Sequence, residues 1–233
     1  MPRACGLTRI TIVEDHVLFA EALDIALTLE GHLVHRVSIE DRRPGGADLL
    51  EAILKTRPRV VLLDLNLGSM NGASVVQPLT AAGVAVVVVT ANSEPARWGE
   101  VLSYGARTVL PKSASLNSIM AAIRLIVQGR PIMPREERDR LLALFHQRRT
   151  QVLDSRSRLE SLTRREREIL DQLIHGRTVR EIARTSFVSE ATVRSQVKSI
   201  LGKLGVSSQL AAVSLALQAG YLPSSAHQMR SAG

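Results

Sequence analysis

The feature that most constrains this chain is a regular alternation of short apolar runs with helix-like segments over its first 130 residues. The five runs, rich in β-branched residues and each predicted to be a strand, are 9–13, 32–37, 59–64, 84–90 and 107–110. The segments between and after them, each predicted to be a helix, are 17–30, 47–56, 73–82, 94–104 and 115–128. Near-continuous apolar strands that alternate with helices are typical of parallel sheets buried on both faces. The pattern predicts an α/β fold with a doubly wound, five-stranded parallel sheet.

Composition argues against several classes of protein. Aromatic residues make up only 3% of the chain, too few for a platform that stacks single-stranded bases. The single cysteine, Cys5, excludes an intramolecular disulfide and a four-thiolate zinc site. No apolar run reaches the roughly 18 residues of a membrane span, and no secretory signal precedes Glu14. We therefore expect a cytoplasmic protein without membrane contact.

The net charge of +8 is unevenly distributed. Residues 1–130 hold 13 Lys and Arg against 12 Asp and Glu, whereas residues 131–233 hold 17 against 10. Such asymmetry indicates a neutral first half and a second half that meets a polyanion such as DNA. Solvated, arginine-rich helices would give the same count, so charge alone does not choose between the two interpretations.

Polar residues follow the predicted strands at the points where ligands bind in such folds. Glu14 and Asp15 follow the first run, and Asp64 ends the third. Thr90 ends the fourth run and Lys112 follows the fifth. Because parallel strands share one carboxyl edge, we expect all five residues to meet there.

These five residues together suit phosphoryl chemistry. Three carboxylates attract Mg²⁺, and Asp64 is also a candidate nucleophile towards phosphorus. The Lys112 ammonium would neutralise phosphoryl oxygens, and the Thr90 hydroxyl would hydrogen-bond one of them. Taken singly, Asp15 or Thr90 could instead cap a helix, and Lys112 could be an ordinary surface lysine.

Four motifs in residues 7–130 resemble the receiver domain of bacterial two-component response regulators, which has a flavodoxin- or CheY-like fold. They are EDH at 14–16, DLNLGSMNG at 64–72, VVVVTA at 86–91 and GARTVLPK at 105–112. The resemblance implies that Asp64 is the phosphoacceptor and that Thr90 and Lys112 are the switch and phosphate-binding residues. It also implies a Mg²⁺ site made by Glu14, Asp15, Asp64 and the backbone carbonyl of Asn66.

Two positions depart from the receiver pattern. Gly68 stands where the family usually has a proline, and Val109 where it usually has an aromatic residue that reorients during activation. Trp98 and Tyr104, in the preceding predicted helix, are either substitutes for that aromatic residue or packing residues.

The segment 135–160 is charged and prone to form a helix, so we expect a helical linker. Leu141, Phe145, Val152 and Leu159 follow a heptad-like spacing that Arg148 interrupts. A two-stranded coiled coil and a helix folded against one domain both fit this pattern.

The residues after 161 predict a helix-turn-helix. Thr163 followed by Glu166 is a capping box, Thr178 opens a second short helix and Ser189 caps a third. The third helix runs to about Lys203 and is followed by a fourth over about 207–219. On the third helix Arg194, Ser195 and Lys198 share an outward face, which suits either DNA contact or simple solvation.

The motifs LTRRERE, EIA, SEATVRSQV and KLGV, at 162–168, 181–183, 189–197 and 203–206, resemble the LuxR-type DNA-binding domain. With a receiver in front, the whole chain is similar to response regulators of the NarL/FixJ class. The resemblance implies base contacts from Arg194, Ser195 and Lys198, and a dimer interface on DNA formed by 207–219. Further cations are candidates for phosphate contacts; these are Arg164, Arg165, Arg177, Arg180 and Lys203. Gln196 and Gln209 replace a histidine and an arginine common in the family.

The predicted organisation is a receiver over 1–130, a linker over 131–160, a DNA-binding domain over 161–222 and a flexible tail over 223–233. The leading hypothesis is a transcription regulator, not an enzyme, that takes a phosphoryl group from a histidine kinase, dimerises and binds double-stranded promoter DNA at two-fold or direct half-sites. A second hypothesis keeps DNA binding but makes the receiver a phosphorylation-independent dimerisation or ligand-sensing module. A third is a Mg²⁺-dependent hydrolase that uses Asp64, although no second acid is placed to activate a leaving group.

Overall fold

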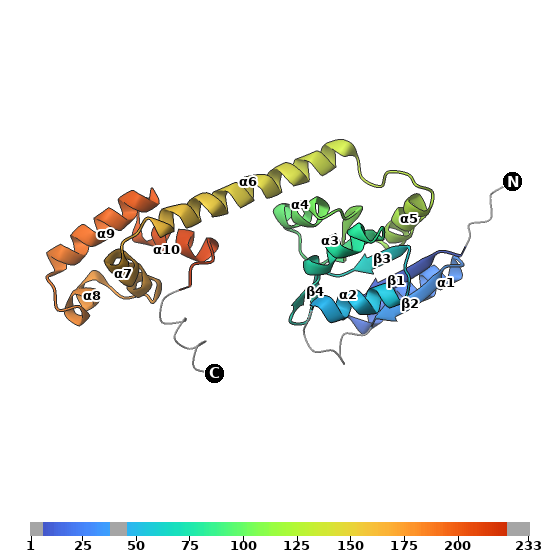
Figure 1. Cartoon of the computed structure of the whole chain (residues 1–233), viewed down its shortest axis with the longest axis horizontal. Helices are drawn as coiled ribbons and strands as arrows, with labels where there is room; N and C mark the ends of the chain where they lie inside the picture. The colour runs from blue at the N-terminus through green and yellow to red at the C-terminus, as the bar shows by residue number, and fades with distance from the viewer. Residues whose placement is uncertain (1–6, 38–45, 223–233) are drawn as a thin grey trace. The chain divides into compact units, whose positions relative to one another are not determined.

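The computed structural model describes residues 7–37 and 46–222, so the tail expected over 223–233 lies outside the described residues. Its contacts divide the chain into two units, Met1–His146 and Gln147–Gly233. Figure 1 labels the helices of both units and several strands of the first. The domain boundaries expected at residues 130, 160 and 222 stay predictions.

The first unit is built on the predicted parallel sheet. Its five strands are β1 (Arg9–Val13), β2 (Leu33–Val37), β3 (Val60–Leu63), β6 (Ala85–Thr90) and β7 (Thr108–Pro111). They pair in the order β2-β1-β3-β6-β7, and every pair is parallel. The inner strands β3 and β6 consist entirely of buried residues, as their uninterrupted apolar sequences require. The predicted α/β class is confirmed.

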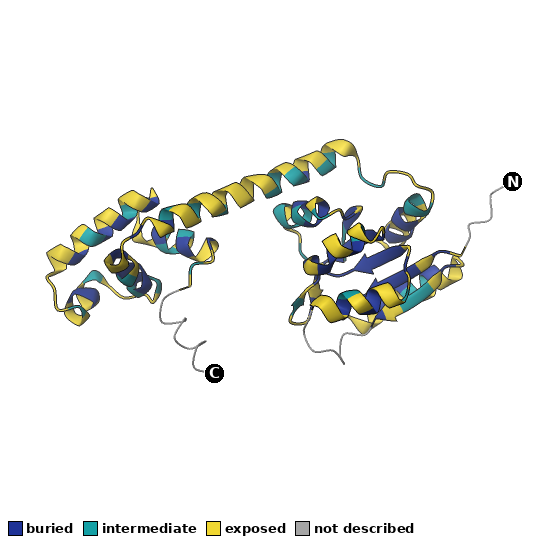
Figure 2. Ribbon diagram, viewed as in Figure 1, coloured by how far each residue is buried: buried dark blue, intermediate teal, exposed yellow. Residues whose placement is uncertain are grey.

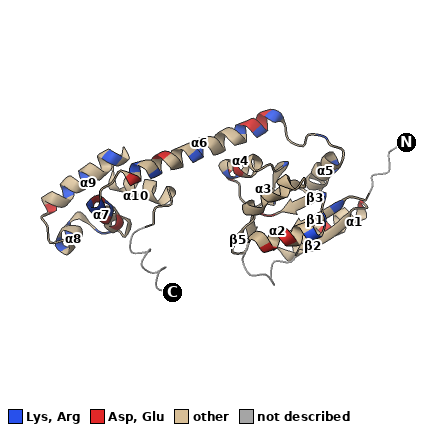
Figure 3. Ribbon diagram, viewed as in Figure 1, with Lys and Arg blue, Asp and Glu red and all other residues tan. Residues whose placement is uncertain are grey.

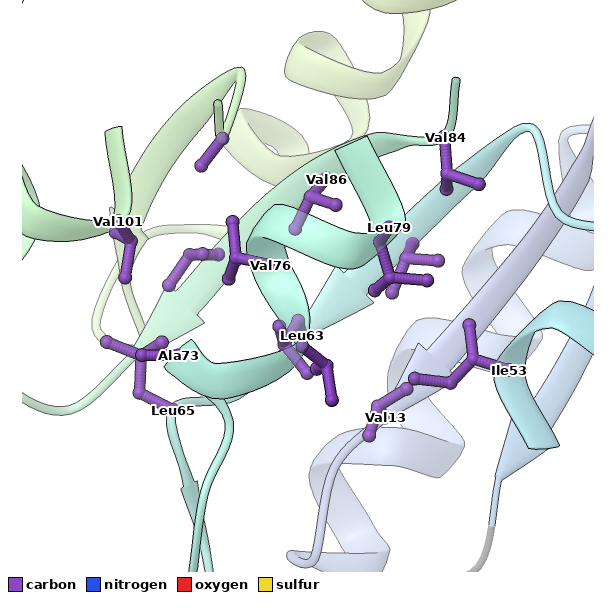
Figure 4. Close-up of a cluster of buried hydrophobic side chains, with 14 of the residues drawn as sticks. Val13, Ile53, Leu63, Leu65, Ala73, Val76, Leu79, Val84, Val86 and Val101 are labelled. Carbon is purple, nitrogen blue, oxygen red and sulfur yellow. The ribbon is translucent and has the colours of Figure 1, made fainter. Parts of the chain in front are cut away.

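Helices cover both faces of this sheet. They are α1 (Val17–Leu29), α2 (Gly46–Lys55), α3 (Ala73–Ala81), α4 (Pro95–Ser103) and α5 (Leu116–Val127). Helices α1 and α5 share one buried apolar cluster with the sheet, and α2, α3 and α4 share another. Figure 4 shows part of the second cluster, where Val76 and Leu79 of α3 lie among Leu63 and Val86 of the sheet. Because helices cover both faces, the carboxyl ends of the strands are where a ligand is expected to bind.

A short hairpin was not predicted. Residues 66–71, between the third predicted strand and the helix that follows it, form the antiparallel strands β4 (Asn66–Leu67) and β5 (Met70–Asn71). Gly68 sits in the turn with φ +62°, a conformation that glycine adopts without strain. Leu67 is buried in the core of the first unit, and this packing holds the otherwise polar hairpin in place.

A helix, α6 (Arg135–Glu160), forms over the segment that was predicted to be helical. Leu141 is 1% exposed and belongs to the core of the first unit. Leu159, near the other end, belongs to the core of the second unit. Most residues between them are exposed, as Figure 2 shows. Both ends of the helix therefore fold against a unit of the same chain.

The second unit contains α7 (Arg164–Ile174), α8 (Val179–Thr185), α9 (Glu190–Leu204) and α10 (Gln209–Gln218). The predicted helix starts are confirmed, because Thr163 and Glu166 form a capping box and Ser189 accepts a hydrogen bond from the Thr192 amide. Thr178 forms a second capping box with Glu181. Helices α8 and α9, with the turn between them, form the predicted helix-turn-helix.

Within residues 7–37 and 46–222, no single helix combines the length and apolar character needed to cross a membrane. Helices α9 and α10 meet that requirement only as a joined pair bent by 50°.

Candidate functional site

Four stretches of chain bring the predicted site residues to one edge of the sheet. Glu14 and Asp15 follow β1, and Asp64 follows β3. Thr90 is the last residue of β6, and Lys112 follows β7. The main-chain ladder continues past the strand ends, since the Asp64 amide donates to the end of β1 and the Lys112 amide donates to the Thr90 carbonyl, each at 2.9 Å. The parallel pairing thus produces the expected convergence.

The Lys112 ammonium lies between two of the carboxylates. Its Nζ is 2.7 Å from Asp64 Oδ2 and 2.7 Å from Glu14 Oε1. The Asp64 and Glu14 side chains are 1% and 3% exposed, so the ion pairs are largely withdrawn from water. Burial alone would lower the pKa of Lys112, but the hydrogen bonds to the two carboxylates outweigh it and raise that pKa. Lys112 is therefore a charged member of the site and not an ordinary surface lysine.

Asp15 faces the hairpin and does not cap the following helix. The N-cap residue of α1 is His16, which makes no side-chain capping bond. Asp15 Oδ2 instead accepts a hydrogen bond from the Gly68 amide at 3.0 Å. Burial raises the pKa of Asp15, but this hydrogen bond and smaller favourable interactions outweigh the effect, and the pKa is lowered. A proline at position 68 could neither donate this bond nor adopt φ +62°. The departure at Gly68 thus serves the acidic site.

His16 is a member of this pocket that the sequence analysis missed. Its Nδ1 lies 3.0 Å from Glu14 Oε1, 2.9 Å from Asp15 Oδ1 and 3.1 Å from Lys112 Nζ. The hydrogen bond with Glu14 is the main cause of a raised pKa for this imidazole, partly opposed by the charge of Lys112. Its position directly after two acids was the available signal.

The residues of the pocket fit a hard divalent cation. Asp64 Oδ1 is buried and finds no hydrogen-bond partner within the described part of the chain. Such an oxygen is costly to bury unless a donor or a cation meets it. One potential ligand atom from each of Glu14, Asp15, His16 and Asp64 lies within 4.8 Å of the others. Asn66, expected to add its carbonyl, is the first residue of β4, two residues after Asp64.

Thr90 is buried at the same edge and tied to the loop that follows it. Its Oγ1 accepts a hydrogen bond from the Asn92 amide at 3.2 Å. The N-cap of α4 is Glu94, so Thr90 does not cap that helix. Val109 is 3% exposed and lies within β7. The position that is aromatic in most receivers is therefore filled here by a small core residue.

The second unit presents the predicted DNA-reading face on α9. Arg194, Ser195 and Lys198 are exposed. The opposite face of α9 is buried in the core through Val193 and Val197, together with other apolar residues. Figure 3 shows the cations on α7, α8 and α9. This division leaves one face of α9 exposed among the residues of its unit that the structure describes.

The candidate phosphate contacts differ in how they are engaged. Arg177 and Arg180 are exposed near the start of α8. Arg164 is 95% exposed and pairs with Glu168 at 3.3 Å. Lys203, in contrast, is held 2.7 Å from Glu166.

Glu166 itself is 3% exposed, and both of its carboxylate oxygens accept hydrogen bonds. One carboxylate oxygen accepts hydrogen bonds from Lys203 and from the Thr163 amide, each at 2.7 Å. The other oxygen accepts one from the Ser199 hydroxyl at 2.7 Å. Burial works against the charge, but these hydrogen bonds lower the pKa of Glu166 to about 2. The carboxylate therefore joins the start of α7 to the end of α9.

Known proteins match this chain over both units. The model of the response regulator receiver domain matches residues 10–124, and that of the bacterial regulatory proteins of the luxR family matches residues 160–216. The probable transcriptional regulatory protein NarL of Mycobacterium tuberculosis is 31% identical over 212 residues, covering 90% of this chain and 94% of the relative. The transcriptional regulatory protein DegU of Brevibacillus brevis is 28% identical over 227 residues, covering 92% and 94%. The solved receiver domain of the putative response regulator NarL from M. tuberculosis is 30% identical, covers 53% of this chain and 98% of that one, and has a TM-score of 0.45.

This chain is a response regulator. Its two parts are a receiver domain and a LuxR-type DNA-binding domain, so both resemblances are confirmed. Response regulators of this kind are transcriptional regulators, which agrees with the expected class of function. The phosphorylation-independent alternative is not favoured, since this response regulator keeps the assembled receiver pocket around Asp64.

Proposed function

We propose that this response regulator accepts a phosphoryl group on Asp64 from a sensor histidine kinase, dimerises, and then binds promoter DNA. The observation that carries the proposal is the state of the Asp64 carboxylate. One oxygen is 2.7 Å from the Lys112 ammonium, and the other is buried without a partner in the described chain. A carboxylate held in this way has one oxygen neutralised and one oxygen available as a nucleophile.

In the proposed step the available Asp64 oxygen attacks phosphorus, and the bond between phosphorus and the kinase imidazole nitrogen breaks. The imidazole keeps the electron pair of that bond and takes up a proton, and an acyl phosphate remains on Asp64. Lys112 pairs with a phosphoryl oxygen, and Thr90 turns its hydroxyl towards another. Mg²⁺ held by Glu14, Asp15, Asp64 and the Asn66 carbonyl would neutralise the charge that spreads over the phosphoryl oxygens.

The DNA-binding part of the proposal rests on the exposed face of α9. Arg194, Ser195 and Lys198 would contact base edges in the major groove. Contacts to DNA phosphates would come from Arg164, Arg177, Arg180 and, more weakly because of its pairing with Glu166, Lys203. Two copies would place two α9 helices at half-sites about 10 bp apart, in two-fold or direct order.

The exposed Leu210 and Leu217 of α10 support dimerisation on DNA through that helix. Because the proposed partner is the chromosome, we also propose a cytoplasmic location.

Labelling with radioactive acetyl phosphate in the presence of Mg²⁺ tests the assignment of Asp64. We expect acid-stable but base-labile label, as an acyl phosphate gives, on the wild type and none on Asp64→Asn. Asp24→Asn serves as the control, because Asp24 lies on α1 and hydrogen-bonds to Thr28 of the same helix. Equal labelling of all three proteins would refute the assignment.

The same preparations test the link to DNA. We expect phosphodonor to raise the affinity of the wild type for sites selected from a random duplex library, and to leave the affinity of Asp64→Asn unchanged. An affinity indifferent to phosphodonor in fully labelled wild type would favour the phosphorylation-independent alternative.

A further inference from the structure

Helix α4 is tied to the loop that directly follows Thr90, the proposed switch residue. The amide, the carbonyl and the side-chain oxygen of Asn92 each take part in a hydrogen bond there. Its amide donates to Thr90 Oγ1 at 3.2 Å, and its side-chain oxygen accepts from the Glu94 amide at 2.8 Å. Its carbonyl accepts a hydrogen bond from the indole Nε1 of Trp98 at 2.7 Å. Two hydrogen bonds therefore connect Thr90 to a side chain in the middle of α4.

The residue after Trp98 places α4 directly against α6. A Cβ built on Gly99 would lie 2.8 Å from the carbonyl carbon of Leu141 and closer still to its oxygen. It would also lie 2.8 Å from the Cβ of Phe145, although real Cβ contacts essentially never fall under 3.0 Å. The two helices can approach this closely only because residue 99 has no side chain. The clash would be with main chain, which cannot be relieved by rotating a side chain.

A second contact fixes the same surface. The Arg138 guanidinium on α6 donates to the carbonyls of Leu102 and Ala106, at 3.0 and 3.1 Å. Leu102 lies in the last turn of α4, and Ala106 lies in the turn that follows it, where the helix dipole favours a positive charge. Leu141 completes the contact by packing into the core of the first unit. The first half of α6 is thus held by α4 at two points.

We propose that this α4–α6 contact, made by Trp98, Gly99, Arg138 and Leu141, transmits the phosphorylation state of the receiver to the DNA-binding domain. The proposal rests on the proposed phosphorylation of Asp64. When Thr90 turns to the phosphoryl group, the Asn92 amide loses its acceptor and the loop rearranges. The carbonyl that holds Trp98 moves with the loop, α4 shifts, and the close fit at Gly99 is lost. Helix α6 then leaves the receiver.

The packing explains why a small shift is sufficient. Close-packed helices without a side-chain layer between them tolerate little displacement before their contacts are lost. The usual receiver aromatic cannot supply the movement here, because its position is taken by the buried Val109. Trp98 is the single tryptophan of the chain and the indole donor of the loop, so it also reports the change.

Hydrogen exchange and DNA binding of the full chain test this device, each with and without acetyl phosphate and Mg²⁺. In the wild type we expect phosphodonor to speed amide exchange in residues 138–146 and to change Trp98 emission. DNA affinity should rise by a factor in the range of about 5 to 150, the usual span of coupling between sites. In Gly99→Ala, exchange in 138–146 should be fast in both conditions, and DNA affinity should change less than about twofold with phosphodonor.

Three further variants distinguish a loss of coupling between the receiver and DNA binding from a general loss of folding. Leu141→Ala removes the contact from the α6 side without a clash and should behave like Gly99→Ala. Trp98→Phe keeps the ring but removes the indole donor, and should reduce the phosphodonor effect on DNA affinity. Ser103→Ala, on the exposed side of α4, should behave like the wild type. All variants should retain label on Asp64, which shows that the receiver is folded.

The outcomes are distinguishable. A wild type that takes no label overturns the proposed phosphorylation and this inference with it. A fully labelled wild type whose exchange in 138–146 is unchanged overturns this inference alone. The same holds if labelled Gly99→Ala keeps the full gain in DNA affinity.

Discussion

The buried carboxylate of Glu166 allows the most quantitative prediction. Replacing it with glutamine keeps the size of the side chain but removes its charge, so Glu166→Gln resembles the wild type with that group protonated. The ion pair with Lys203 is then lost, and the amide group faces Ser199 or the ammonium. The variant should destabilise the second unit, because this side chain joins α7 to α9.

The magnitude follows from linkage. The pKa of Glu166 falls from 4.5 to about 2, and each pH unit of difference between folded and unfolded states is about 1.36 kcal/mol, giving about 3 kcal/mol. Lys203 is 36% exposed, so solvent screens part of the attraction, and we expect about 2 kcal/mol at pH 7. Because the folded pKa is the lower one, this stability is present above pH 4.5 and is lost as the pH falls towards 2.

Hydrogen exchange of the full chain measures this loss in the second unit alone. The slowest amides of α9 should exchange about 30-fold faster in Glu166→Gln at pH 7, which corresponds to about 2 kcal/mol. Glu168→Gln is the matched control, since its partners Arg164 and Arg165 are exposed surface groups, and it should change exchange very little. Calorimetry between pH 7 and pH 3 should show the melting temperatures of wild type and Glu166→Gln converging. A gap that is independent of pH, or absent at pH 7, would refute the reasoning.

Two other variants test the charged sites. Lys112→Met leaves the buried Asp64 and Glu14 carboxylates without their ammonium partner. In EDTA the free energy of unfolding of the receiver should therefore fall by about 3–5 kcal/mol. Adding Mg²⁺ should raise the melting temperature of this variant more than that of the wild type. Since the pKa of Lys112 is raised, its contribution in the wild type should persist below pH 10.5 and fade above it; an equal Mg²⁺ gain in both proteins would contradict the assignment. Arg194→Ala should cost about 1–3 kcal/mol of discrimination at one base pair in each half-site, whereas Arg164→Ala should weaken binding to all sequences alike and reduce the salt dependence. Identical specificity profiles for the two variants would count against the assigned roles.

The sheet and its site were predictable because both depend on local signals. Apolar runs identified the strands, and parallel pairing then determined that Asp64, Thr90 and Lys112 share an edge. The capping residues Thr163 and Ser189 marked where helices of the second unit begin, because side-chain capping depends on neighbours three residues away.

The features that escaped prediction depend on contacts between distant segments. The ion pair of Glu166 with Lys203 joins residues 37 positions apart, and the capping-box pattern accounts for only part of the bonds that Glu166 makes. Gly99 lies inside a predicted helix, where a glycine only weakens the prediction. The reason for a glycine at this position is the close approach of α6 to α4, which the sequence does not reveal.

The two departures from the receiver pattern have a common explanation in the contacts around them. At Gly68 the chain loses a rigid proline but gains an amide that donates to Asp15, and this bond favours the charged form of that carboxylate. At Val109 it loses an aromatic ring near Thr90, while Trp98 reaches the same loop from α4 through the Asn92 carbonyl. At the first position the amide of Gly68 itself bonds to Asp15, and at the second the indole of Trp98 bonds to the loop after Thr90. Adding Val109→Tyr to Trp98→Phe should not restore the phosphodonor effect on DNA affinity, because the new ring would not bind the Asn92 carbonyl that holds α4.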